Sequence, residues 1–181
     1  MRRLVVTVIA LVCVTLSAPG ASASSRPKMR LSSPAFDPGG EIPDGFTCSG
    51  ANASPPLRWK GVPKKAEELA LVVLDPDAPI GTVVRWLAWG IDPKTGGLPE
   101  ETVPADVVQG RNQAGRPAYL GPCPPPGDDP HHYKFTLYAL SKPLALSEGA
   151  SLDELRDAMR STVLARARLV GTYARPQQDT A

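Results

Sequence analysis

Three stretches of the chain have the hydrophobic pattern of β-strands. Residues 69–74 (LALVVL) form a continuous apolar run, which is typical of a strand buried on both faces. Residues 85–91 (RWLAWGI) carry two tryptophans three positions apart and predict a second strand. Residues 133–140 (YKFTLYAL) begin with alternating apolar and polar side chains, which indicates a half-buried strand. Strands therefore dominate the predicted fold.

Long irregular segments and one helix complete this pattern. Residues 120–130 contain five prolines, which remove backbone donors and exclude a central strand, and residues 92–118 also lack a strand or helix period. A helix is predicted from Ser151, which can form a capping box with Glu154. We expect its apolar stripe to pack on the sheet, the stripe being Leu152, Leu155, Met159 and Val163. Short strands and one late helix predict a single, mainly β domain.

The N-terminus has the order of a secretory signal peptide. Arg2 and Arg3 precede an apolar stretch, Leu4 to Leu16, and small residues lead to Ala23, where we expect cleavage. The apolar stretch is shorter than the roughly 20 residues that span a bilayer. Lipid attachment at Cys13 is the alternative, although the bulky Val12 precedes this cysteine where such a site needs a small residue.

These observations divide the chain and predict where it works. We expect a protein that is secreted or periplasmic and keeps no stable membrane span after cleavage. The expected segments are a signal peptide (1–23), a flexible leader (24–30), a single folded domain (31–176) and a flexible tail (177–181).

The charge of the chain argues against nucleic-acid binding, and its cysteines leave two structural alternatives. Cleavage would remove Arg2 and Arg3 and leave 18 basic against 18 acidic side chains, without the clustered positive surplus of a nucleic-acid-binding protein. Cys48 and Cys123 remain after cleavage. They are either a disulfide, which an exported protein can keep, or two buried thiols.

Two segments next to predicted strands concentrate titratable residues. Residues 75–79 (DPDAP) end the apolar strand and hold two carboxylates in a proline-bracketed loop. Residues 121–133 (GPCPPPGDDPHHY) lead into a strand with the only two histidines of the chain. A histidine at such a junction can bind an anion, transfer a proton or ligate a metal. His132 is expected to be exposed, because adjacent strand residues point to opposite faces.

At these residues the chain closely resembles the phosphatidylethanolamine-binding protein (PEBP) family, in particular its bacterial, Raf-kinase-inhibitor-like branch. The resemblance covers nearly all of residues 31–175 and is carried by DPDAP, GPCPPPG and the following H-x-Y, in this order. It implies a PEBP-like antiparallel β-sandwich with peripheral helices, including one C-terminal helix. It also implies a small polar pocket that receives phosphate, sulfate or a phosphoethanolamine head group.

The resemblance assigns pocket roles to residues of this chain. Asp75 and Asp77 match the family's pocket aspartates, although an aspartate such as Asp77 can equally fix its own turn. Pro79 matches the proline that closes the loop. Gly121 matches a glycine of the pocket wall, Cys123 matches a further wall residue, and Tyr119 matches an aromatic residue near the rim. His131 and Tyr133 match the histidine and the tyrosine of the second motif.

The chain departs from the family where a pocket histidine usually precedes an aromatic residue, because here Arg85 precedes Trp86. Arginine can bind phosphate with two donors, which would strengthen the site. It can also fill the pocket and pair with Asp75 or Asp77, which would close it. Both outcomes stay open at this stage.

The favoured function is therefore a non-enzymatic binding protein for a small phosphate-like anion or phospholipid head group. The alternative is a regulator or inhibitor of an extracytoplasmic protease or envelope enzyme. A hydrolase that uses Cys48 or Ser54 as its nucleophile is less favoured, because no G-x-S-x-G nucleophile motif is present. No cofactor is expected. No metal is expected either, because His131, His132 and Cys123 lack the spacing of a zinc site.

Overall fold

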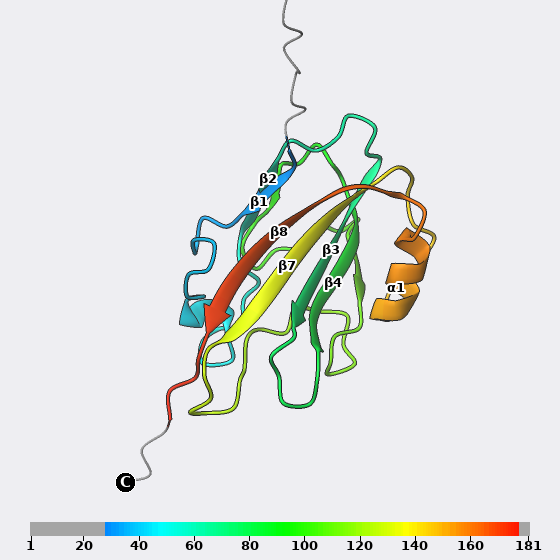
Figure 1. Cartoon of the computed structure of the whole chain (residues 1–181). Coiled ribbons are helices and arrows are strands. Elements are labelled where there is room, and N and C mark those ends of the chain that lie inside the picture. Colours follow the sequence, from blue (N-terminus) through cyan, green and yellow to red (C-terminus); the bar gives the residue numbers. More distant parts are fainter. Residues whose placement is uncertain (1–27, 178–181) are drawn as a thin grey trace, which may run out of the picture.

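The computed structural model describes residues 28–177, and the predicted signal peptide, residues 24–27 of the predicted leader and residues 178–181 of the predicted tail lie outside this range. Within it the chain forms eight strands, one α-helix and one short 3-10 helix (Figure 1). The helices are η1 (Asp44–Phe46) and α1 (Leu152–Met159). The strands are β1 (Arg30–Ser32), β2 (Leu57–Lys60), β3 (Glu68–Asp75), β4 (Val83–Ile91), β5 (Gly97–Leu98), β6 (Val108–Gly110), β7 (His131–Leu140) and β8 (Val163–Tyr173).

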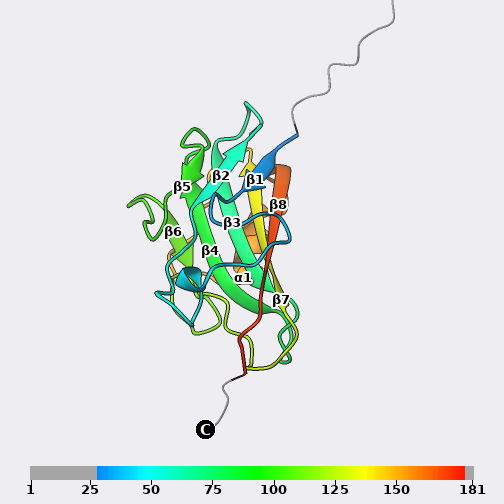
Figure 2. The same ribbon diagram turned by 90° about the vertical axis from the view of Figure 1, so that its left-hand side faces the viewer.

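The strands form two antiparallel sheets that face each other. A small sheet has the order β1-β2-β5, and a larger sheet has the order β6-β4-β3-β7-β8. Figure 2 shows the small sheet lying in front of the larger one. The predicted class, a mainly β antiparallel sandwich, is confirmed.

The main core fills the space between the two sheets. Alternate residues of β3 point into it, and Leu71 and Val73 are almost completely buried there. Trp59 of the small sheet packs in the same cluster, together with Phe135 and Leu137 of β7. Because every second residue of a strand faces this side, the register of β3 is determined by this core.

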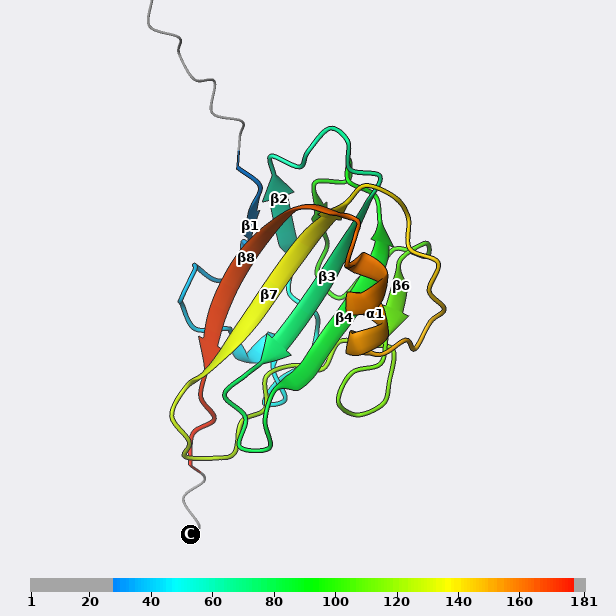
Figure 3. The same cartoon turned by 45° about the vertical axis from the view of Figure 1, so that its right-hand side comes forward.

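A second apolar layer lies on the outer face of the larger sheet. Ala70 and Val72 of β3 point to this face and pack in one cluster with Leu155 and Met159 of α1. Figure 3 shows α1 lying over this face of the sheet. The run at 69–74 is apolar at every position because both faces of β3 are buried. Within residues 28–177, no helix has the length and hydrophobicity needed to cross a bilayer.

The three predicted strands and the helix start are confirmed, and two expectations need correction. Val163 was expected on the apolar stripe of the helix, but α1 ends at Met159 and Val163 begins β8 with 43% of its surface exposed. The chain turns between them, where the Thr162 backbone N–H donates to the Met159 carbonyl. The flexible leader was expected to reach residue 30, but Arg30 lies in β1 and Met29 is buried, so the core includes both positions.

The capping box at the start of α1 provides a test of local stability. The Ser151 hydroxyl accepts from the Glu154 backbone N–H, and the Glu154 carboxylate accepts from the Ser151 backbone N–H at 2.7 Å. Replacing Ser151 by alanine is expected to lower the free energy of unfolding by about 1 kcal/mol. Urea unfolding would measure this loss, and Ser147→Ala, at an exposed position before the helix, is the control.

Candidate functional site

The ends of three strands of the larger sheet converge at one end of the molecule, at the bottom of Figure 1. Asp75 is the last residue of β3, His131 is the first residue of β7, and Arg85 lies near the start of β4. The sequence motifs are therefore distant along the chain but meet in space, because antiparallel pairing places the end of β3 beside the starts of its neighbours.

The Asp75 carboxylate is the centre of this site. It is fully buried, and its Oδ2 atom accepts from Arg85 Nη2 at 2.8 Å. His131 Nδ1 lies 3.2 Å from the same oxygen, so a proton on this nitrogen donates to the carboxylate. The Asp77 backbone N–H donates to Oδ1 at 3.1 Å, which shapes the loop after β3. A buried charge needs such partners, and Asp75 has three.

Arg85 occupies the place that the family pattern gives to a histidine, and it lies inside the site. Only 7% of its side chain is exposed. Its Nη1 atom donates to the Gly121 carbonyl at 3.1 Å, and its guanidinium carbon lies 5.5 Å from the centre of the Tyr133 ring. Arg85 pairs with Asp75, as the second alternative supposed, but this pairing leaves Arg85 Nε without a hydrogen-bond partner among the described residues, so one donor of the guanidinium stays unused.

Two buried polar groups of the site have no hydrogen-bond partner among the described residues, namely Arg85 Nε and the Tyr133 hydroxyl. The hydroxyl lies near the Asp75 carboxylate and the Cys123 backbone N–H without reaching good hydrogen-bond geometry with either. Burial, and then the neighbouring Asp75 charge, raise the pKa of Tyr133, so its hydroxyl stays protonated. Both groups can therefore donate to an acceptor.

The wall of the site is held by contacts from a distant loop. The Gly121 backbone N–H donates to Asn52 Oδ1 at 2.8 Å, and the Tyr119 hydroxyl donates to the Phe46 carbonyl at 2.8 Å. A Cβ atom on Gly121 would lie 2.6 Å from that same Phe46 carbonyl oxygen, so only glycine fits. Tyr119 packs edge-on against Trp86 at 5.5 Å between ring centres, which makes it part of the wall rather than a free rim residue.

A disulfide joins the same two loops. Cys48 and Cys123 are bonded, with their Cα atoms 5.4 Å apart, which decides the alternative that the sequence left open. The Cys48 backbone N–H also donates to the Pro122 carbonyl at 3.0 Å. The wall segment 121–123 is therefore linked to the loop after η1 by a covalent bond and by hydrogen bonds.

Asp77 and His132 form a separate pair outside the buried site. Asp77 Oδ2 accepts from the His132 backbone N–H at 2.8 Å and lies 2.7 Å from its Nδ1 atom. These two contacts lower the pKa of the Asp77 carboxyl. His132 is exposed, as expected from strand alternation, and Asp77 fixes the loop after β3 against the start of β7.

A shallow depression opens over His131. Its wall consists of three aspartates, two histidines and a proline: Asp77, Asp128, Asp129, Pro130, His131 and His132. Asp75, Arg85 and Tyr133 lie buried beneath it. Of the pocket residues that the resemblance assigned, Asp77 and His131 line this depression, and Pro79 is exposed in the neighbouring turn.

Sequence reasoning missed two contributors to the site. Asp128 Oδ2 lies 3.7 Å from His131 Nε2, three positions before it in the chain. Asn52 holds Gly121 from another loop and has a positive φ of 57°, which asparagine tolerates better than most residues. Asp128 was visible as a carboxylate beside the histidine motif, whereas no local signal points from Asn52 to the site. Within residues 28–177, no group of three histidine, cysteine or acidic side chains has the arrangement of a metal site.

Comparisons with known proteins agree with the fold. The sequence model of the family described as phosphatidylethanolamine-binding protein matches residues 32–174. A candidate lipoprotein of Mycobacterium tuberculosis, LppC, is 45% identical, over 80% of this chain and 72% of its own. The structure of CT736 from Chlamydia trachomatis, described as a candidate PEBP homologue, has a TM-score of 0.79 and 38% identity, covering 83% of this chain and 99% of its own. YbcL of Escherichia coli has a TM-score of 0.77 and 29% identity, covering 82% and 99%.

Proposed function

The chain belongs to the phosphatidylethanolamine-binding protein family, and from this premise we propose that it binds a small phosphate-bearing head group at the Asp75–Arg85–His131 site. The observation that carries the proposal is the pair of buried donors without partners, Arg85 Nε and the Tyr133 hydroxyl. A buried donor that lacks an acceptor costs about 1–3 kcal/mol. A phosphate oxygen that accepts from them would remove this cost.

The mouth of the site favours a zwitterion over a bare anion. Asp77, Asp128 and Asp129 line the depression above His131 and repel a free phosphate ion. A ligand that carries an ammonium group next to its phosphate would place the positive group among these carboxylates. Phosphoethanolamine has this arrangement, and we expect it to bind more tightly than inorganic phosphate.

The proposal is for binding without catalysis. A hydrolase at this site would need a nucleophile near His131, and Cys48, one of the two candidates, is bonded to Cys123. Ser54, the other, is buried. No described contact joins either residue to His131, so the geometry supports a binding role.

Regulation of a protease or an envelope enzyme has less support. Such a role calls for an exposed apolar patch apart from the pocket. Among residues 28–177 the exposed large apolar side chains are Ile80, in the turn beside the site, and Val163 and Leu164, at the start of β8. These side chains lie at opposite ends of the molecule and form no broad patch.

Export is part of the same proposal. The similarity to LppC, named as a candidate lipoprotein, supports a location in the cell envelope. The Cys48–Cys123 disulfide is also typical of a protein that leaves the reducing cytosol. We propose that the signal sequence directs the chain out of the cytoplasm.

Calorimetric titration of the protein recovered after export tests the binding role. Phosphoethanolamine is expected to bind saturably, and Tyr133→Phe is expected to weaken its binding about fivefold to tenfold, because one buried donor to the phosphate is lost. This variant removes only the hydroxyl and keeps the aromatic ring beside Arg85.

Tyr138→Phe is the matched control, since Tyr138 lies on the same strand and packs in the outer apolar layer under α1. Its titration curve should equal that of the unmodified protein. Absence of saturable binding for both phosphoethanolamine and phosphate would contradict the proposed function. Equal affinities of Tyr133→Phe and the unmodified protein would contradict the role of this hydroxyl.

A further inference from the structure

A basic surface extends from the end of the molecule opposite the Asp75 site to the middle of β8, where Arg168 pairs with Thr136. Two adjoining hollows share Lys28, Met29 and Arg166 in their walls and run between β1, β8 and the loop after β2. Together the walls contribute six cations and no aspartate or glutamate. We name this region the basic end, defined by Lys28, Arg30, Lys64, Lys65, Arg166 and Arg168.

The cations of the basic end are available to a partner. All six residues are exposed, and none has a carboxylate within 4.0 Å in the part of the chain that the structure describes. The formal net charge of the chain is only +2, so the composition alone does not indicate that six cations lie together here.

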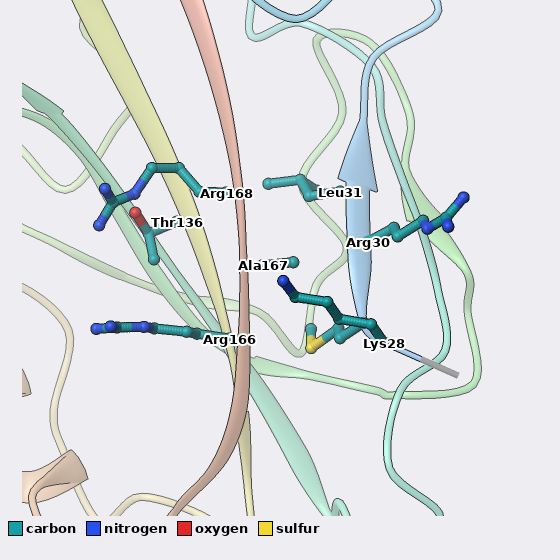
Figure 4. A pocket seen from close by; sticks show the side chains of 8 residues that line it. Lys28, Arg30, Leu31, Thr136, Arg166, Ala167 and Arg168 are labelled. Carbon is teal, nitrogen blue, oxygen red and sulfur yellow. The ribbon is translucent and has the colours of Figure 1, made fainter. Parts of the chain in front are cut away.

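The directions of the side chains argue against a pocket for one small anion. Arg166 and Arg168 extend from one side of β8, alongside Thr136 of β7 (Figure 4). Lys28 lies on the other side of β8, toward β1, and Arg30 points away from the groove (Figure 4). Cations that diverge in this way cannot enclose one phosphate. Arg166 and Arg168 point the same way, so they can each contact a different phosphate of an extended anionic surface.

The surroundings of these cations favour a lipid surface over a nucleic acid. Leu164 lines one of the two hollows together with Lys28 and Arg166. Leu164 and Val163 expose 42% and 43% of their surfaces. Apolar side chains among cations can enter the interface of a bilayer. The walls of the two hollows contain no aromatic ring on which bases would stack.

We propose that the basic end binds the surface of an anionic phospholipid membrane. The Asp75 site lies at the far end of the sandwich. Bound in this way, the protein presents that site to the solution rather than to the bilayer that holds it.

Vesicle co-sedimentation of the protein recovered after export tests this surface. We expect binding to phosphatidylcholine vesicles that contain phosphatidylglycerol and no binding to pure phosphatidylcholine vesicles. Arg166→Gln combined with Arg168→Gln is expected to lower the partition coefficient roughly thirtyfold, since each cation near an anionic bilayer contributes to attraction. Raised salt should weaken binding of the unmodified protein.

The matched control is Arg156→Gln combined with Arg160→Gln, which removes the same charge from two exposed positions, one on α1 and one directly after it. This control should keep most of the vesicle binding, and the β8 variant should keep its phosphoethanolamine affinity, which separates this surface from the Asp75 site. Equal losses in both double variants would overturn the proposal in favour of a net-charge effect. Absence of vesicle binding would overturn it as well. So would binding to heparin, a soluble polyanion, by a protein that does not bind the vesicles.

Discussion

Asp75→Ala is expected to lower the free energy of unfolding by about 3–5 kcal/mol, because it leaves the Arg85 guanidinium buried without its carboxylate. The side chain of Arg85 is 7% exposed and that of Asp75 is fully buried, so water cannot replace the lost contact. His131 and the Asp77 backbone N–H lose the same acceptor. Urea unfolding followed by tryptophan fluorescence would measure the loss.

A double variant separates the charge effect from loss of packing. Asp75→Ala with Arg85→Met removes both charges and is expected to be clearly more stable than Asp75→Ala alone, because no unpaired charge remains. Asp77→Ala is the control at the exposed pair with His132 and should cost at most about 1 kcal/mol. A double variant less stable than Asp75→Ala would show that the buried pair is not the source of the loss.

Three strands with strong local signals were predictable, whereas the short strands and the 11-residue β8 were not. The continuous apolar run at 69–74 and the alternation from Tyr133 are such local signals, and both form inner strands of the larger sheet. The three-residue β1 and the two-residue β5 are too short to have a period. They become strands because their partners on β2 supply hydrogen bonds, which is a tertiary effect.

The spacing of apolar residues misled the prediction at Val163. Four positions after Met159, it continues the helical stripe, but the chain turns at Thr162 and begins β8. Pairing of β8 with the whole of β7 outweighs the additional helical turn. Helix ends are therefore decided by the partners available to the next segment, which local spacing does not contain.

In the site, as in the fold, short motifs were recognisable in the sequence, whereas contacts between distant segments were not. The segments that contain Asp75, His131 and Tyr133 were noticed because each adjoins a predicted strand, and the resemblance to the family assigned these residues to one pocket. The partner of Arg85 was left open, since only the fold places it 2.8 Å from Asp75. Asn52 was missed because its contact with Gly121 joins two loops far apart in sequence.

Both ends of the sandwich follow from one topology. Antiparallel pairing places the end of β3 and the start of β7 at one end, and their opposite termini at the other. The first end collects carboxylates around a buried arginine, whereas the second collects exposed cations. The proposed ligand site and the proposed membrane surface are therefore physically separate, and variants at one can be tested without changing the other.

Removal of the Cys48–Cys123 disulfide is expected to lower the free energy of unfolding by about 4 kcal/mol, because the bond closes a long loop in the unfolded chain. The two cysteines are 75 residues apart, which restricts the unfolded state strongly. Cys48→Ser with Cys123→Ser measures this loss in urea. Loss of the bond also frees the wall segment beside Gly121, so phosphoethanolamine binding should weaken as well.

Chemical reduction provides the control for this variant. Reductant should lower the stability of the unmodified protein to about that of the double serine variant, and it should leave the variant itself unchanged. The hydrogen bond from the Cys48 backbone N–H to the Pro122 carbonyl involves no sulfur atom, so we expect it to hold the wall in place in the weakened protein. If reductant left the unmodified protein as stable as before, the disulfide would not stabilise the fold, and the link between the two loops would depend on hydrogen bonds alone.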